Sequence, residues 1–169
     1  MTVDIKLIVN GTEHAIEVNP TDMLLDLLRD RLGYRGTNKD CAHGICGCCT
    51  VLLDEQPVTS CIFLAVQADG AKITTVEGLE SNGRLHPLQE AFLRHGAVQC
   101  GFCTPGFLMT AKAFLDSNPH PTRAEIADAL RGNICRCTGY QKIIDAVAAV
   151  TGTDSFVDAF NNKQENRND

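Results

Sequence analysis

Nine cysteines are the residues of this sequence whose type and spacing could carry out chemistry. They fall into two groups, one at positions 41–61 and one at positions 100–137. In a reducing compartment, grouped cysteines bind a metal or take part in redox reactions more often than they form disulfides. We expect such a compartment, the cytoplasm, because the opening residues MTVDIKLIVNG carry no charged-then-apolar leader.

The first group has the spacing C-x4-C-x2-C-x11-C, formed by Cys41, Cys46, Cys49 and Cys61. Its first three members have the spacing of plant-type ferredoxins, which hold a 2Fe-2S cluster on four thiolates. Such a cluster is an anion, so its burial is costly unless hydrogen-bond donors surround it. Glycines let a loop wrap closely and direct its N–H groups at the sulfurs. Three glycines lie where this wrapping is needed: Gly36, Gly44 and Gly47.

Two further residues of this group allow other interpretations. Cys48 could replace a neighbouring ligand, but C-x2-C would then become C-x1-C, so we interpret Cys48 as a free thiol beside the site. His43 could indicate a Rieske-type site, which needs two histidines and two cysteines. Because four cysteines already fit, we interpret His43 as a loop residue. Five cysteines cannot all pair with one another, so zinc is a stronger alternative than disulfides.

The second group has the spacing C-x2-C-x31-C-x1-C, formed by Cys100, Cys103, Cys135 and Cys137. Zinc sites generally place two to four residues between both cysteines of a pair, so the C-x1-C pair favours iron–sulfur and leaves zinc as the alternative. Cys103 is followed by Thr104-Pro105, an N-cap and a first-turn proline that open a predicted helix, and Cys137 is followed by Thr138-Gly139 and then another predicted helix. Helix N-termini stabilise anions and lower the pKa of nearby thiols.

The elements that must position the first group form a small mixed sheet with one helix. Residues 5–9 alternate between apolar and polar, Asn10-Gly11 predicts a type I′ hairpin, and residues 15–18 form the returning strand. A helix is expected after Asn19-Pro20, with Gly33 at its C-terminus. Its apolar face carries four leucines: Leu24, Leu25, Leu28 and Leu32. Further strands are expected at 50–53, 57–59 and 72–76, which gives a domain at 1–78.

The second group lies in a helical half. Helical patterns occupy residues 86–95, 105–116, 122–131 and 140–150, and a linker is expected at 77–85. Thr122 and Glu125 form a capping-box pattern, and Asn118-Pro119 ends the preceding helix. Four short helices with short links predict a compact bundle. We therefore expect a helical domain at 79–160 and a polar tail at 161–169.

Composition excludes several kinds of partner. The formal net charge is −6, which argues against nucleic acid and anionic membranes as main partners. Hydrophobic residues make up 44% of the chain, enough for a packed core. No apolar run approaches the roughly 20 residues that span a bilayer, so we expect that the protein is not an integral membrane protein.

Taken together, the two groups resemble the small iron–sulfur subunit of the molybdenum hydroxylases, the xanthine oxidase family. The resemblance covers about residues 5–150 and depends on four motifs: RGTNKDC (35–41), CGCCTV (46–51), QCGFCTPG (99–106) and GNICRCTGY (132–140). One departure is Cys48, whose position usually holds a small residue without a thiol. The resemblance implies an α+β chain, in which a ferredoxin-like β-grasp domain precedes a four-helix bundle and each carries one 2Fe-2S cluster.

The resemblance also implies partners and two contacts to a cofactor. Gln99 matches the glutamine that hydrogen-bonds molybdopterin, and Cys137 matches the ligand nearest the pterin amino group. Molybdopterin would lie in a large subunit and FAD in a medium subunit of a dimer of heterotrimers. The chain itself would hold no catalytic residue and would pass electrons from molybdopterin towards the flavin or an external acceptor.

The motifs of this chain do not identify the substrate of such a complex, and analogy with similar enzymes favours an N-heteroaromatic compound. Two alternative functions remain at this point. One is a free-standing ferredoxin with two clusters, and the other is a structural zinc-binding interaction module.

Overall fold

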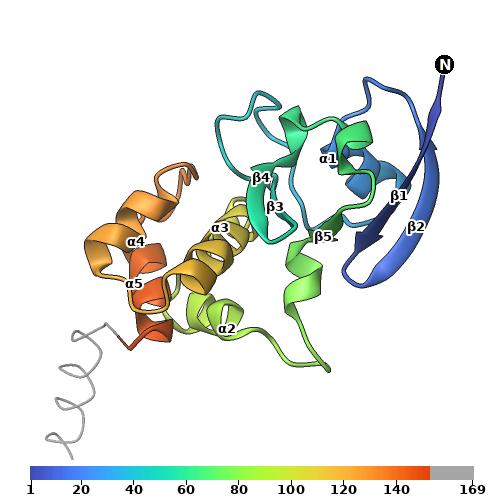
Figure 1. Cartoon of the computed structure of the whole chain (residues 1–169). Helices are drawn as coiled ribbons and strands as arrows, with labels where there is room; N and C mark the ends of the chain where they lie inside the picture. The colour runs from blue at the N-terminus through green and yellow to red at the C-terminus, as the bar shows by residue number, and fades with distance from the viewer. Residues whose placement is uncertain (153–169) are drawn as a thin grey trace, which may run out of the picture.

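The computed structural model describes residues 1–152, and the expected tail at 161–169 and the end of the expected helical domain lie outside this range. Within residues 1–152, five strands and a short α-helix form the first half, and four α-helices form the second (Figure 1). This arrangement confirms the predicted α+β order of a mixed sheet followed by a helical bundle. No helix among residues 1–152 has the length and hydropathy needed to cross a membrane.

The sheet has the strand order β2-β1-β5-β3-β4. β1 (Val3–Val9) and β2 (Thr12–Val18) form the predicted antiparallel hairpin, with Val9 opposite Thr12. Asn10 and Gly11 have φ values of 50° and 82°, the left-handed backbone that a type I′ turn requires. Along β1, only alternate side chains are buried, beginning with Ile5, so one face of the hairpin packs on the core.

The pairing of β3 with β4 brings the last two cysteines of the first group, Cys49 and Cys61, together. β3 (Thr50–Leu53) pairs with β4 (Gln56–Thr59), and Thr50 lies opposite Thr59. β5 (Lys72–Thr74) lies between β1 and β3, parallel to β1 and antiparallel to β3. The expected strand at 72–76 is therefore two residues too long, because Val76 begins the 3-10 helix Val76–Leu79.

The predicted helix of the first half is split into two short elements. α1 (Leu24–Asp26) runs directly into a π-helical turn at Leu27–Arg31, and Gly33 ends the segment with a φ of 83°. Leu24, Leu27 and Leu28 are buried in the core of the sheet half. Leu25 packs instead against two cysteines of the first group, so the helix also forms one wall of the candidate site.

The helical half consists of α2 (Pro87–Arg94), α3 (Thr104–Ser117), α4 (Arg123–Leu130) and α5 (Gln141–Val150). These bounds confirm the predicted helices to within one residue at every end. The capping box is also confirmed, since Thr122 Oγ1 accepts from Glu125 N and a Glu125 carboxylate oxygen accepts from Thr122 N.

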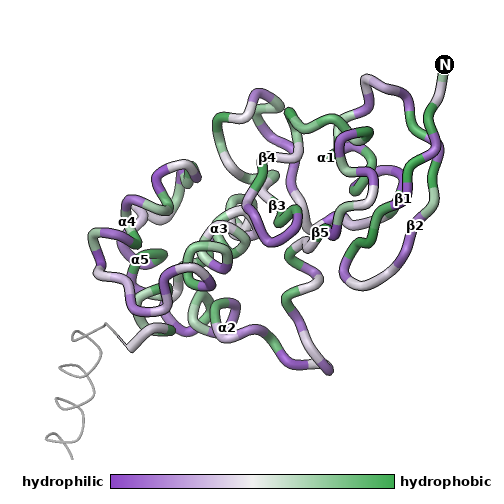
Figure 2. The backbone as a smooth tube through the Cα atoms, in the orientation of Figure 1, coloured by the Kyte–Doolittle hydropathy of each residue, from purple (hydrophilic) through white to green (hydrophobic). Residues whose placement is uncertain are grey.

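The two halves share part of their packing. The apolar residues of the helices form one cluster, to which Leu52 of β3 and Leu79 contribute. Leu79 lies in the expected linker at 77–85, so the first residues of that linker are packed rather than free. Residues of α3 and α5 contribute to this shared core, and Figure 2 shows hydrophobic stretches along both helices. Figure 1 shows α3 lying beside β3 and β4.

Candidate iron–sulfur sites

The first candidate site lies in the loop between the helix of the sheet half and β3. Cys46, Cys49 and Cys61 are buried, and Cys41 is half-buried. The pairing of β3 with β4 brings Cys61, in the 3-10 helix Ser60–Ile62, next to Cys49. Ser60 fixes this approach, because its backbone N–H and its hydroxyl both donate to the carbonyl oxygen of Cys49, at 3.3 Å and 2.7 Å.

Backbone N–H groups of this loop point at the cysteine sulfurs. Cys41 Sγ accepts at 3.4 Å from the N–H groups of His43, Ile45 and Cys46, and Cys61 Sγ accepts at 3.4 Å from Gly44 N. The hydrogen bond from His43, with those from Cys46 and Ile45, lowers the pKa of Cys41 to about 6. Donors of this kind stabilise a thiolate and an anionic cluster bound to it.

The glycines and the histidine of the first group differ in what they contact. Gly44 and Gly47 both have positive φ, 73° and 70°, which is the close wrapping expected of this loop. The ring of His43 hydrogen-bonds the carbonyl oxygen of Cys41 through Nδ1, which agrees with a loop residue. Gly36 donates its N–H at 2.7 Å to the carboxylate of Glu77, so its contact is with the end of the sheet half.

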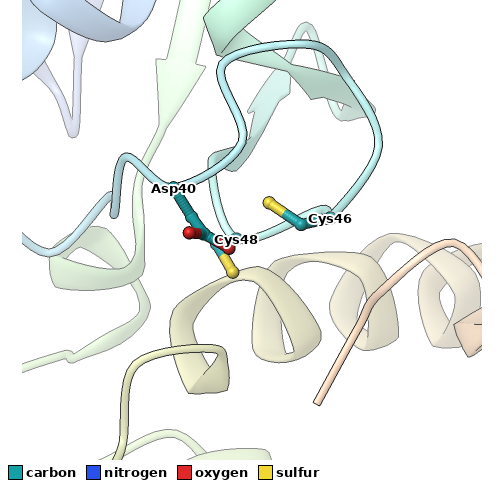
Figure 3. Close-up of side chains that lie close together, drawn as sticks. All are labelled: Asp40, Cys46 and Cys48. Atoms are coloured by element: carbon teal, nitrogen blue, oxygen red, sulfur yellow. The ribbon is translucent and has the colours of Figure 1, made fainter. Parts of the chain in front are cut away.

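Cys48 points away from the loop interior. Figure 3 shows its sulfur directed towards the start of α3, whereas the sulfur of Cys46 points into the space enclosed by the loop. Asp40 lies beside Cys48, and the ligand atoms of Asp40, Cys46 and Cys48 are all within 4.8 Å of one another. Burial raises the pKa of Cys48 to about 12, which keeps it a neutral thiol. Asp40 is a neighbour of this site that the sequence did not indicate as a candidate.

The second candidate site joins the start of α3 to the segment between α4 and α5. Cys103 directly precedes the first helical residue, Thr104, so the predicted helix start is confirmed with the cap one residue earlier than expected. Cys137 Sγ lies 3.6 Å from Cys100 Sγ. Burial raises the pKa of Cys103 to about 12, and a side-chain hydrogen bond with Cys135 contributes. The chain fold thus brings together all four cysteines of the second group.

Thr138 supplies hydrogen bonds to this second site. Its hydroxyl lies 3.0 Å from Cys135 Sγ, and its backbone N–H lies 3.4 Å from the same sulfur. Burial alone would raise the pKa of Cys135, but the hydrogen bonds from Thr138, together with those from Cys137 and Cys103, outweigh burial and lower that pKa. Donor sets of four cysteines with N–H and O–H groups around them fit 2Fe-2S clusters at both sites.

The two sites contact each other through hydrogen bonds to backbone carbonyl oxygens of the first loop. Ile134 N donates at 2.9 Å to the carbonyl oxygen of Cys46, and Asn133 Nδ2 donates at 3.0 Å to the carbonyl oxygen of Gly47. A Cβ on Gly106 of α3 would lie 2.1 Å from that same Gly47 oxygen. Sequence reasoning missed these contacts, although Asn133 and Gly106 both lie within the motifs that carried the resemblance.

One edge of the second site is open to solvent. Gln99, Cys100 and Cys137 are exposed, whereas Cys135 is buried. Phe102 and Ile134 expose 45% and 47% of their surface next to these cysteines. The residue expected to contact molybdopterin, Gln99, therefore lies on an accessible face together with Cys137.

Comparison with known proteins agrees with two iron–sulfur domains. Residues 7–75 match the family model of the 2Fe-2S iron-sulfur cluster binding domain, and residues 75–148 match that of the [2Fe-2S] binding domain. The chain is 52% identical to the 6-hydroxypseudooxynicotine dehydrogenase complex subunit beta of Paenarthrobacter nicotinovorans, over 94% of both proteins. It is 47% identical to the caffeine dehydrogenase subunit gamma of a Pseudomonas species, over 88% of this chain and 91% of that one.

A solved structure shares the fold as well as the sequence. The chain superimposes on a chain of quinoline 2-oxidoreductase from Pseudomonas putida 86 with a TM-score of 0.86 and 47% identity, covering 89% of this chain and 94% of that one. Sequence and fold are thus similar over nearly the full length of both chains. The chain therefore belongs to the small iron–sulfur subunits of the molybdenum hydroxylases, the electron-transferring chains of these oxidoreductases.

Proposed function

We propose that each group of four cysteines holds one 2Fe-2S cluster. Cys41, Cys46, Cys49 and Cys61 are the ligands in the sheet half, and Cys100, Cys103, Cys135 and Cys137 are the ligands in the helical half. The observation that carries this proposal is the set of hydrogen bonds aimed at the cysteine sulfurs of both sites. When bound, each cluster supplies a centre that takes up and releases one electron. The boundary between the two domains lies near residue 78.

Metal analysis of the purified complex tests this assignment. We expect about four irons and four acid-labile sulfides per small subunit and two distinguishable EPR signals on reduction. A colourless protein that contains zinc would instead identify a structural interaction module. Cys100→Ser and Cys46→Ser should each remove one of the two signals and leave the other.

Electrons from substrate enter this chain at the helical site and leave it at the sheet site. The exposed edge formed by Gln99, Cys100 and Cys137 supports this direction, because it lets the molybdopterin of a large subunit approach the helical site. The amide of Gln99 would hydrogen-bond the pterin there. Gln99→Ala should slow reduction of the helical-site cluster by substrate and leave its reduction by dithionite unchanged. Equal rates with substrate in the variant and the wild type would contradict this role.

A second partner covers the sheet site. Ile45 and Ile62 expose 65% and 56% of their surface beside the first cysteine group, and exposed apolar pairs next to a redox site favour docking of another protein. The proposed occupant is an FAD-binding subunit, in a complex that assembles as a dimer of heterotrimers. Ile45→Asp should release that subunit and retain the molybdopterin subunit, whereas Leu93→Asp, at an equally exposed position on α2, should release neither.

The substrate of the complex is an N-heteroaromatic compound. Three relatives at 47–51% identity are named for nicotine, nicotinate and caffeine, and the similar solved structure is named for quinoline. Relatives named as aldehyde oxidoreductases are 42–46% identical. Turnover of a pyridine or purine panel against an aldehyde panel by the purified complex distinguishes the two classes.

Purification from the cell also tests the alternative of a free-standing ferredoxin. If this chain purifies alone, without a large subunit, it is a free-standing ferredoxin.

The compartment proposed for this complex is the cytoplasm. All nine cysteines are unpaired, and the eight proposed ligands must stay reduced until the clusters are built. A reducing compartment maintains such thiols. Fractionation of cells that produce the complex tests this location.

A further inference from the structure

A closed ring of hydrogen bonds surrounds Cys135 of the helical site. Cys135 N donates to the hydroxyl oxygen of Tyr140 at 3.1 Å, and Tyr140 N donates to Thr138 Oγ1 at 3.2 Å. Thr138 Oγ1 completes the ring with its contact of 3.0 Å to Cys135 Sγ. Each of these three residues is therefore hydrogen-bonded to the other two.

The chemistry of the groups fixes the direction of the last hydrogen bond. A backbone N–H can only donate, so Tyr140 N occupies a lone pair of Thr138 Oγ1. A cysteine that binds iron does so as a thiolate, which carries no proton to donate. The proton of the Thr138 hydroxyl must therefore point at Cys135 Sγ, where it forms a charge-assisted hydrogen bond.

The backbone at Tyr140 is strained in a way that serves this ring. Tyr140 has a φ of 68°, a left-handed conformation that is rare for a bulky side chain. The aromatic ring of Tyr140 packs edge-on against that of Phe107, with 6.2 Å between the ring centroids. Such strain persists where the surroundings enforce it and is found mostly at functional sites. Here it allows the amide and the hydroxyl of one residue to contact both Thr138 and Cys135.

We propose that the Thr138 hydroxyl sets the reduction potential of the helical-site cluster and that Tyr140 is the residue that positions it. This inference rests on the proposed role of Cys135 as a cluster ligand. Reduction adds negative charge to the cluster, and a hydrogen bond to a ligand sulfur stabilises the reduced form more than the oxidised form. The Thr138 hydroxyl therefore raises the potential of this cluster.

The two sites differ in a way that makes this tuning local. The hydrogen bonds to Cys41 and Cys61 in the sheet half come from backbone N–H groups, which a side-chain substitution does not remove. At the helical site, one donor is a side-chain hydroxyl. A single substitution at Thr138 should therefore shift one potential and leave the other where it is.

The test is a redox titration of the assembled complex in which the EPR signal of each cluster is the readout. Thr138→Val keeps the shape and removes the hydroxyl. At a fixed solution potential, it should lower the ratio of reduced to oxidised helical-site cluster about tenfold, which for one electron is about 59 mV. Thr138→Ser keeps the hydroxyl and should change this ratio less than twofold. In each of these variants, the sheet-site cluster should titrate as in the wild type.

Thr50 offers a matched control, because it also follows a proposed ligand, Cys49. Its hydroxyl donates at 2.8 Å to the carbonyl oxygen of Gly47 rather than to a sulfur. Thr50→Val should therefore change the ratio of reduced to oxidised cluster less than twofold at both sites. An equal shift in Thr50→Val and Thr138→Val would overturn the proposal, because it would show a general effect of losing a nearby hydroxyl.

Further variants keep the outcome decisive. If Thr138→Val does not retain the helical-site cluster, Thr138→Ala gives the same measurement with less bulk. An unchanged potential in either variant with both clusters present overturns the proposal, as does loss of the cluster in the Val, Ala and Ser variants alike. Loss of the helical-site cluster in Thr138→Val and Thr138→Ala, with its retention in Thr138→Ser, would support the proposal, because the cluster would then depend on the hydroxyl. Cys135→Ser tests the underlying ligand assignment separately, because retention of both EPR signals there would refute the ligand and not the hydrogen bond.

Discussion

The amide nitrogen of Ile134 donates a hydrogen bond of 2.9 Å to the carbonyl oxygen of Cys46. Cys46 is a proposed ligand of the sheet site, and Ile134 directly precedes Cys135, a proposed ligand of the helical site. The two sites are thus connected through adjacent backbone rather than through the segment that links the two halves. Since electron tunnelling falls steeply with distance, a short and rigid connection suits a chain that transfers electrons between two centres.

The close approach of Gly106 to the first loop should make this position intolerant of any side chain. In Gly106→Ala, the new Cβ would lie 2.1 Å from the Gly47 oxygen and 3.0 Å from Cys48 Cα, both backbone atoms that cannot rotate away. Overpacking of this kind costs typically about 1–3 kcal/mol. We expect a lower thermal unfolding midpoint for the complex-bound chain and faster loss of iron to a chelator.

Gly132→Ala is the matched control for this substitution. Gly132 lies in the segment that leads to Cys135, and a Cβ there would meet no atom within 4 Å. Its unfolding midpoint and its iron retention should equal those of the wild type. If both glycine variants behave alike, the contact between α3 and the first loop does not limit stability.

Asn133 should stabilise the contact between the sites by its side chain. Asn133 is 3% exposed and donates to Gly47 O, which also accepts from Thr50 N at 3.1 Å. Asn133→Ala leaves that oxygen a partner, so the cost should be that of one hydrogen bond and a small void, about 1–2 kcal/mol. Differential scanning calorimetry should show a midpoint lower by about 2–6 °C. His120→Ala, at an exposed position, serves as the control, and an equal midpoint in both variants would contradict the prediction.

Local signals in the sequence were sufficient to predict most elements of the fold. The capping box at Thr122 and the break at Asn118-Pro119 fixed helix ends to within about a residue, because caps satisfy backbone groups within one turn. The Asn10-Gly11 hairpin was equally local. The division of the first helix into α1 and a π-helical turn was not predicted, since the leucine periodicity is compatible with either form.

The contacts between the sites could not be predicted in the same way. Gly47 and Gly106 approach each other through backbone atoms, and the sequence records this only as the lack of a side chain at both positions. Asn133 donates to a carbonyl oxygen, which every residue has, so no complementary residue type marks its partner. The cysteine groups were apparent because their chemistry depends on side chains at fixed spacing, whereas their docking depends on how two folded halves meet.

His86 should make the stability of the helical half depend on pH. Its Nδ1 accepts from Leu88 N at 3.2 Å and caps α2. Burial and nearby Lys112 lower the pKa of His86 below the value of 6.5, against a smaller opposing effect of Asp116. The unfolded chain therefore binds more protons than the folded chain just below pH 6.5, so stability falls as the pH falls through this range and levels off below the folded pKa.

His86→Asn provides the comparison for the pH prediction. Asparagine also accepts a hydrogen bond at a helix N-terminus but does not titrate. The loss of thermal midpoint between pH 7.5 and pH 5.8 should be smaller in the variant than in the wild type. An identical pH dependence in both proteins would show that groups other than His86 cause it.

Cys48 should be dispensable for both clusters, although it lies between two proposed ligands. Its sulfur is directed towards α3 and away from the interior of the first loop, and burial keeps it a thiol (Figure 3). Cys48→Ala should therefore retain about four irons per chain and both EPR signals, with a loss of stability of no more than about 1 kcal/mol for the small void. Cys49→Ala, the adjacent position, should lose the sheet-site cluster. Loss of a cluster in Cys48→Ala with retention in Cys49→Ala would show that the first loop binds through C-x1-C, with Asp40 and Cys48 beside Cys46 as the ligands to examine.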